Sequence, residues 1–431
     1  MVLIYIDEAS KRLNYILNII FSQRGIAYRL SNDIHQFRNS EGIKFVYSDR
    51  HFDESYPQLS PADLLFEERI APQRIDKVQW RGEEILSFGG KVDVLASIFY
   101  ILTDYEDYTT EGRDLHGRLA ANNSLVFKFG WINKLVIERW TLAFIAYLEE
   151  KSGSKLKVDK IAFKMIPSFD IDNSYAFKLK TGWRKWMSFG KDLLRFDKER
   201  IRERKKVNLG EIRDPYDTFD YISEISKRGF EIKMFWLLGD YALYDRNIGH
   251  NITLHKRLIR KMTSFAEIGL HPSYKSNDFP DSLLKEKERL RSILGKEIFS
   301  SRQHFLRLKL PVTYERLIKA GFKHDYTMGF ADHTGFRTGI SRPYKWFNLA
   351  SNSETELIIH PFAYMDGTLN EYRGLTVEES KVHIGELIDE VRNFGGDFVF
   401  IWHNETIGDY GKWKGWSEVL EYTLTKGIEV Q

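Results

Sequence analysis

The sequence contains no cysteine. That absence excludes disulfide bridges and thiolate metal sites, so any bound metal would depend on histidine and carboxylate side chains. No segment reaches the run of about 18 apolar residues that a membrane-spanning helix needs. An excess of one charge is also lacking, because 64 Lys and Arg face 61 Asp and Glu, and we therefore expect no nucleic-acid partner.

The N-terminus lacks the features of an export signal. Asp7 and Glu8 lie within it, and no small-residue cleavage site follows the apolar stretch 13–21. The hydrophobic fraction of 42% is typical of a globular chain with a buried core. We therefore expect a cytoplasmic protein.

A chain of 431 residues is too long for one ordinary core, so we expect two domains. Residues 1–155 have the mixed pattern of an N-terminal α/β domain of unknown role, and the polar stretch 151–155 is the predicted boundary. Residues 156–431 alternate between strand and helix, which indicates parallel strands with right-handed crossovers. Strands are expected at 161–172, 231–238, 266–271, 298–306, 322–330, 356–361 and 397–403. Seven such units favour a closed or nearly closed barrel over an open sheet.

A basic insert at about 180–213 interrupts this alternation. It contains Arg200, Arg202 and Arg204, and two tryptophans, Trp183 and Trp186, lie near them. A solvated helix with charged faces is the favoured interpretation. The alternative is a flap that meets an anionic glycan or a membrane surface.

Titratable residues follow nearly every expected strand, at the end where parallel α/β barrels carry their functional groups. Asp170 and Asp172, two positions apart, face the same side of a strand, so one can bind a metal while the other acts as a base. A turn-forming pair is the alternative. The other strand ends carry His271 and Tyr274, Arg302, His304 and Phe305, Arg337, and Trp402 with His403. A lone histidine is more often structural and a tryptophan more often core, but together these residues indicate a site.

The order of these motifs resembles that of the polysaccharide deacetylase family. The resemblance is carried by the runs 169–172, 269–271, 302–305, 335–337 and 402–404. It is closest to a Bacteroidetes-type branch in which an uncharacterised N-terminal domain precedes the barrel. The runs that resemble this domain are 65–67, 99–100, 105–108 and 114–118.

The resemblance implies a distorted (β/α)7 barrel that binds a divalent metal, often zinc, and removes N-acetyl or O-acetyl groups from sugars. By position, Asp170 would be the base that activates water, and Arg302 would orient it. Asp172 and His271 would bind the metal. His403 would be the acid that protonates the leaving amine.

The sequence departs from the family's pattern at two positions. Lys275 stands where the family has a second histidine four residues after the first, and His304 replaces the usual proline of the third motif. We expect His304 to supply the missing ligand, with His333 and His360 as weaker candidates. The residues expected to contact the substrate are Arg337, Trp402, Tyr274 and Phe305.

The leading hypothesis is a metal-dependent deacetylase of an acetylated sugar. Because a cytoplasmic enzyme would not meet finished cell-wall polymer, a nucleotide-linked or lipid-linked intermediate of surface polysaccharide is the expected substrate. Peripheral membrane contact through the basic insert would suit a lipid-linked one. One alternative is a catalytically degenerate barrel that acts as a glycan-binding or scaffolding module. Another is a different amidohydrolase on a related barrel.

Overall fold

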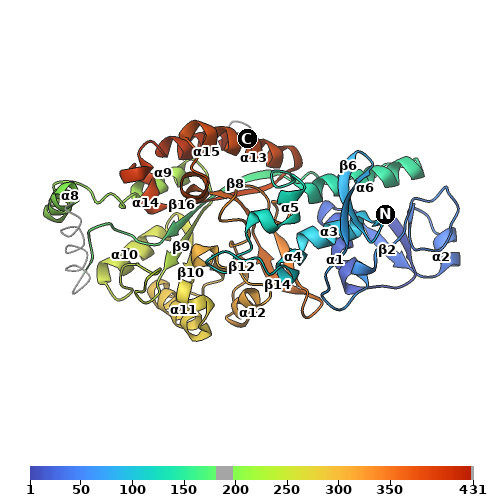
Figure 1. Cartoon of the computed structure of the whole chain (residues 1–431), viewed down its shortest axis with the longest axis horizontal. Coiled ribbons are helices and arrows are strands. Elements are labelled where there is room, and N and C mark those ends of the chain that lie inside the picture. The colour runs from blue at the N-terminus through green and yellow to red at the C-terminus, as the bar shows by residue number, and fades with distance from the viewer. Residues whose placement is uncertain (181–197, 429–431) are drawn as a thin grey trace.

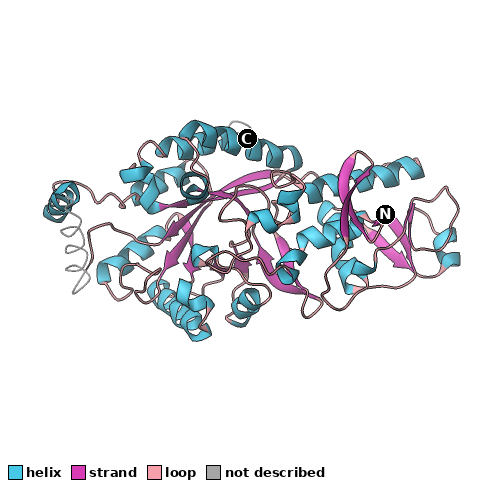
Figure 2. Cartoon of the chain, viewed as in Figure 1, coloured by secondary structure: helices cyan, strands magenta, loops and turns pink. Residues whose placement is uncertain are grey.

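The computed structural model describes residues 1–180 and 198–428. These residues form an elongated molecule (Figure 1). Two small sheets lie at the N-terminal end, and a large sheet enclosed by helices occupies the other end (Figure 2). The chain is thus a mixed α/β protein, as predicted.

The N-terminal part contains a parallel sheet and an antiparallel one. The parallel sheet has the order β2-β1-β3-β4, and β5, β6 and β7 form the antiparallel sheet. The strands are β1 (Val2–Ile6), β2 (Tyr28–Ser31), β3 (Ile43–Tyr47), β4 (Gln58–Leu59), β5 (Ile75–Trp80), β6 (Glu83–Phe88) and β7 (Lys91–Val92). The helices are α1 (Lys11–Ile20), α2 (Ile34–Asn39), α3 (Val94–Leu102), α4 (Tyr105–Thr109), α5 (Leu125–Lys128) and α6 (Val136–Ser152).

The large sheet has nine strands in the order β13-β14-β12-β11-β10-β9-β8-β16-β15. All neighbours in it run parallel except β13 and β14. The strands are β8 (Phe163–Ile171), β9 (Ile232–Leu237), β10 (Ala266–His271), β11 (Ser300–Ser301), β12 (His324–Asp325), β13 (Tyr344–Asn348), β14 (Ser353–Ile359), β15 (Phe362–Met365) and β16 (Gly396–His403). Within the described residues no ladder joins β13 to β15, so the curled sheet is an open, distorted barrel. The predicted fold class is confirmed.

Helices cover the large sheet on both sides. In Figure 1, α9, α13 and α15 lie on one side of the strands, and α10, α11 and α12 lie on the other. The helices are α8 (Lys198–Leu209), α9 (Phe219–Lys227), α10 (Thr253–Met262), α11 (Pro280–Leu294), α12 (Val312–Lys319), α13 (Val377–Phe394), α14 (Asn404–Ile407) and α15 (Ser417–Ile428). Helix α13 begins with the predicted capping box, in which Thr376 and Glu379 bond each other's backbone N–H groups.

Two of the predicted strands are much shorter than expected. Strand β11 ends at Ser301 because the chain then turns, with Phe305 and Leu306 both in the left-handed region. Strand β12 keeps only two residues. Strands β13 and β15 were not predicted, and β15 follows β14 after only two residues.

The N-terminal part and the barrel share one apolar core. On the N-terminal side, Tyr15 of α1 and Phe99 of α3 pack on Phe347 of β13, with ring centroids 5.0 and 5.3 Å apart. A buried ion pair also joins the two parts, from Arg342 to Glu138 at 2.8 Å. The domain boundary near residue 155 stays a prediction.

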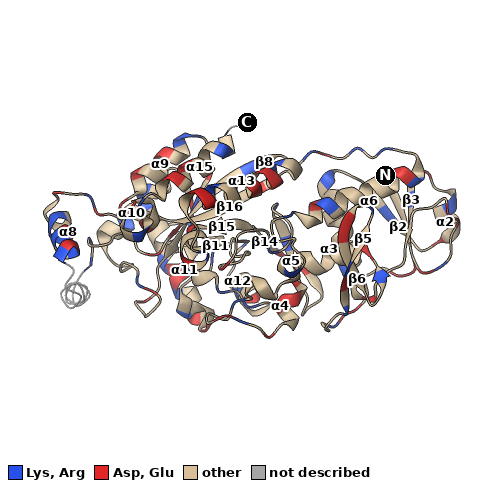
Figure 3. Cartoon of the chain, turned by 45° about the horizontal axis from the view of Figure 1, so that its top comes forward, with Lys and Arg blue, Asp and Glu red and all other residues tan. Residues whose placement is uncertain are grey.

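Helix α8 contains the described portion of the basic insert. It projects at the end of the molecule opposite the N-terminal sheets, and half of its 12 residues are Lys or Arg (Figures 1 and 3). Trp183 and Trp186 lie outside the described residues. Over residues 1–180 and 198–428, no helix has the length and apolar character needed to cross a membrane.

Candidate metal centre and catalytic cavity

Side chains alternate between the two sides of strand β8, and its polar residues near the C-terminal end share one side. Ser168, Asp170 and Asp172 follow one another at every second position, so their side chains point the same way, towards the barrel interior. Strand β16 pairs with β8 in a register that sets His403 beside Asp170. The register of two neighbouring strands therefore brings two carboxylates and an imidazole to one end of the sheet.

Arg302, directly after β11, fixes Asp170. Its Nη1 donates to Asp170 Oδ1 at 2.8 Å and its Nη2 to Ser168 Oγ at 2.8 Å, and both the Arg302 and Asp170 side chains are buried. The guanidinium lies over the ring of Phe235, 4.4 Å from the centroid. That ring fits because position 269 is glycine, where a Cβ would lie 2.6 Å from it. The result is a carboxylate held in one orientation by a buried cation.

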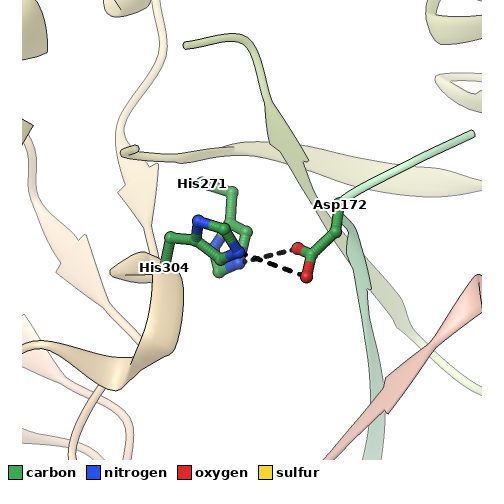
Figure 4. A group of neighbouring side chains, drawn as sticks. All are labelled: Asp172, His271 and His304. Carbon is green, nitrogen blue, oxygen red and sulfur yellow. Dashed lines mark hydrogen bonds and ion pairs between the residues drawn. The ribbon is translucent and has the colours of Figure 1, made fainter. Parts of the chain in front are cut away.

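Three side chains converge in front of Asp170. Asp172, His271 and His304 each offer one ligand atom, and these atoms lie within 4.8 Å of one another. Figure 4 shows both imidazole rings directed at the Asp172 carboxylate. His271 Nε2 lies 3.2 Å from Asp172 Oδ1, and His304 Nε2 lies 3.2 Å from Asp172 Oδ2. Over the described residues this is the one such group of histidines and acids.

The far nitrogen of each ring determines what the near nitrogen can do. His271 Nδ1 lies 2.6 Å from the carbonyl oxygen of Arg302, which can only accept, so Nδ1 carries a proton. The nitrogen that faces Asp172 is then Nε2, which lies 3.2 Å from Oδ1. His304 Nδ1 is likewise bound to the buried Asp245 at 2.9 Å. Rings fixed in this way turn Nε2 towards a carboxylate, where a divalent cation can take the place of a proton.

The charges in this group stabilise one another. Burial would raise the pKa of the Asp172 carboxyl, but His304, His271 and His403 outweigh it and hold that pKa well below its usual range. Burial would likewise lower the pKa of His304, but Asp172 and Asp245 raise it to about 9. An ionised carboxylate is the form that binds a metal, and a proton on His304 is the charge that a metal would displace.

His403 faces the group from β16. Its Nδ1 lies 2.8 Å from Asp366 Oδ1, and its Nε2 lies 3.9 Å from Asp172 Oδ2. Asp366 is fully buried and also accepts from Thr406 Oγ1 at 2.6 Å. Burial would lower the pKa of His403, but Asp366, with Asp172 and Asp170, raises it well above its ordinary value. The imidazole is therefore held as a proton donor that points towards the metal-ligand group.

These residues line one cavity of about 180 Å³. The wall combines charged groups with aromatic and aliphatic side chains, as small-molecule sites do. It is formed by Arg118, Asp170, Asp172, His271, Gln303, His304, Phe305, Leu306, Met365, Asp366, Gly367, Glu371, Tyr372, His403, Glu405, Thr406 and Trp413. Burial, with Asp172 and Asp366 nearby, raises the pKa of Glu405 in this wall to about 7.

Three of the four residues predicted to contact the substrate lie elsewhere. Trp402 is completely buried in the core because it points away from the cavity side of β16. Arg337 is buried against Asp104, 2.7 Å away, so it joins the two parts of the chain. Tyr274 packs on the ring of Phe305, 5.4 Å away, and only Phe305 lines the cavity. The prediction is therefore wrong for Trp402 and Arg337, whereas contact between Tyr274 and the substrate stays a prediction.

The weaker ligand candidates also lie outside the cavity. His333 is near Asp332, 3.6 Å away, and His360 stacks on Tyr326. Lys275, at the position of the family's second histidine, lies with its ammonium 5.5 Å from the ring of Phe279.

Four charged residues that shape the site were not predicted from the sequence. Asp366 directly follows β15, so the strand-end signal was present but the short strand was not recognised. Asp245 lies in an irregular loop with no such signal. Glu405 lies two positions after His403. Arg118 comes from the N-terminal part, and its place in this wall could not be read from the sequence.

Comparisons with known proteins give only distant likenesses. Residues 2–153 match the model of a family of unknown function (DUF7033). No curated protein matches the sequence. Among solved structures, a protein from Mycobacterium smegmatis described as a polysaccharide deacetylase is 14% identical, with 62% of this chain and 86% of that chain covered and a TM-score of 0.41. The polysaccharide deacetylase Bc1974 from Bacillus cereus is 10% identical, with coverage of 62% and 86% and a TM-score of 0.31. The PuuE allantoinase is 12% identical, with coverage of 62% and 84% and a TM-score of 0.37. Among solved structures, the chain is thus similar to polysaccharide deacetylases, the family that its motif order resembles.

Proposed function

We propose that this protein is a metal-dependent hydrolase that removes acetyl groups from a sugar. The observation that carries the proposal is the convergence of one ligand atom each from Asp172, His271 and His304, all within 4.8 Å of one another. Histidine and carboxylate ligands with an open side suit a catalytic zinc ion.

A bound zinc ion would polarise the acetyl carbonyl and lower the pKa of a coordinated water. Asp170 lies next to the ligands, 3.8 Å from His271 Nε2, and would accept the proton from the attacking water. Arg302 occupies the other oxygen of Asp170, so the free oxygen faces the cavity. Asp170 is thereby positioned as the general base.

His403 would donate a proton to the leaving nitrogen or oxygen of the sugar. Asp366 holds Nδ1, so Nε2 is the nitrogen that faces the cavity. Because Asp366 raises the pKa of His403, the ring keeps its proton near neutral pH. The acid and the base thus come from neighbouring strands on one side of the cavity.

The substrate is proposed to be a single acetylated sugar unit seated at the cavity. Phe305 and Trp413 give the wall two aromatic side chains, the kind on which sugar faces stack. Glu371 and Glu405 add carboxyl groups that can accept hydrogen bonds from sugar hydroxyls. Attachment of the sugar to a nucleotide or lipid stays a prediction, as do the choice between N- and O-acetyl groups and the cytoplasmic location.

The test is acetate release from a panel of N-acetylated and O-acetylated sugars by the full chain, stripped of metal and then reloaded with zinc. We expect release that depends on zinc and is lost in D170N. A chain that binds zinc and sugar but releases no acetate would contradict the hydrolase and favour the glycan-binding module. A chain that binds no metal would contradict the proposal altogether.

A further inference from the structure

One residue of the N-terminal part lies in the wall of the cavity, although every other wall residue belongs to the barrel. Arg118 is 5% exposed and uses three nitrogens at once. Its Nη1 donates to the carbonyl oxygen of Phe305 at 2.7 Å, and its Nη2 donates to the hydroxyl of Tyr372 at 3.1 Å. Its Nε donates to Asp114 at 2.6 Å, which anchors the guanidinium to its own loop.

The backbone that Arg118 holds is strained. Phe305 has φ 60° and Leu306 has φ 53°, values that side-chain-bearing residues rarely adopt. His304, the third metal ligand of the proposed function, immediately precedes them. A strained turn persists only where its surroundings enforce it. The bond from Arg118 to the Phe305 carbonyl is one such restraint.

A second hydrogen bond runs in the opposite direction, from the barrel to the N-terminal part. Arg307, just after the turn, donates from Nε to the carbonyl oxygen of His116 at 3.1 Å. The ring of His116 packs against that of Phe305, with centroids 4.9 Å apart. The loop 114–118 and the turn 304–306 therefore hold each other from both sides.

Arg118 also joins two regions of the barrel that are far apart in the sheet. Phe305 follows β11, whereas Tyr372 lies beyond β15 at the sheet edge, and four strands separate β11 from β15. Both residues line the cavity. No strand pairing links these two sides directly within the described sheet. The guanidinium therefore connects opposite sides of the cavity wall.

We propose that the N-terminal part completes the active site, with Arg118 as a positioning residue that fixes the His304 turn and thereby the third metal ligand. The inference rests on the proposed metal-dependent function. It assigns the N-terminal part a role in the metal centre itself. Loss of Arg118 would let the turn relax towards ordinary backbone angles and would withdraw His304 from Asp172 and His271.

The test measures zinc affinity of the full chain by competition with a chromophoric chelator and the visible spectrum of the cobalt-substituted protein. We expect R118Q to bind zinc about 10–100-fold more weakly, as is usual when a group that orients a metal ligand is removed. We also expect an altered cobalt spectrum, and R118K should fall between R118Q and the parent chain. The matched control is R139Q, which removes the ion pair with Glu390 across the two parts, away from the cavity.

Equal zinc affinity and an unchanged cobalt spectrum in folded R118Q would overturn the inference while leaving the proposed function intact. A parent chain that binds no zinc would overturn the proposed function, and the inference with it. If R118Q does not fold, D114N takes its place, because Asp114 is partly exposed and holds the Arg118 guanidinium together with the backbone N–H groups of His116 and Arg118. Zinc binding by D114N that is clearly weaker than that of the parent chain supports the inference. Unchanged zinc binding contradicts it.

Discussion

Replacing His304 with glutamine tests the metal centre most directly. His304 provides one of three converging ligand atoms. Zinc held by four ligands in small peptides binds with about 10–16 kcal/mol, or about 2.5–4 kcal/mol per ligand. The loss of one ligand should therefore weaken zinc binding by about 10²–10³-fold. The two remaining ligands, Asp172 and His271, would hold the metal only weakly.

The same change should leave the protein folded. It removes the bonds of His304 to Asp245 at 2.9 Å and to Asp172 at 3.2 Å, and a bond to a charged partner contributes about 1.5–3 kcal/mol. Asp245 keeps the backbone N–H of Tyr274 at 2.8 Å. Typical domains are stable by about 5–15 kcal/mol, so H304Q should remain native.

Thermal unfolding with and without zinc measures the difference. At a zinc concentration about 1,000 times the parent's Kd, the parent gains about 4 kcal/mol, whereas H304Q should gain about 0.4–1.4 kcal/mol at that concentration. H333Q is the matched control, because His333 lies outside the cavity beside Asp332. Retention of zinc by H304Q at the parent's level, or an equal loss in H333Q, would refute this account of the site.

Three further changes test the rest of the site and the contacts between the two parts of the chain. D170N should reduce acetate release by about 10²–10⁴-fold while zinc stays bound, since Asp170 is the proposed base; bound zinc lost in parallel with activity would argue against that division of roles. D366N should shift the alkaline limb of the pH–activity profile to lower pH, because Asp366 raises the pKa of His403 and the acid must be protonated to act; a profile identical to the parent's would remove His403 from the mechanism. R337A should lower the free energy of unfolding by about 3–5 kcal/mol, because it leaves Asp104 buried without its cation; denaturant titration measures this, and a change under about 1 kcal/mol would contradict the role of that pair.

The fold was predictable from the sequence where an apolar strand ends in titratable residues. Strand β10 has the predicted bounds, 266–271, because an apolar run there ends at a histidine. The spacing of Asp170 and Asp172 correctly placed both on one side of β8. The general rule that parallel strands carry polar groups at one end then brings these residues together without any contact being known.

The rest depends on contacts between distant parts of the chain. The ion pair between Arg337 and Asp104 joins residues 233 positions apart, and no local pattern marks such a pair. Trp402 alternates with His403 along β16, so the face it occupies depends on the register of that strand. The turn at Phe305 has left-handed backbone angles, but no glycine stands at that position to indicate them in the sequence. The positions of Asp245 and Arg118 follow from loop paths that only the folded chain defines.

The shared core between α1, α3 and β13 bears on how this protein can be dissected. Cutting the chain near residue 155 would strip Tyr15 and Phe99 from Phe347 and leave that face of the barrel open to water. Exposed aromatic surface of this kind promotes aggregation. Inactivity of an isolated barrel would therefore reflect its misfolding. Point substitutions in the intact chain are the sound way to find out what each part contributes.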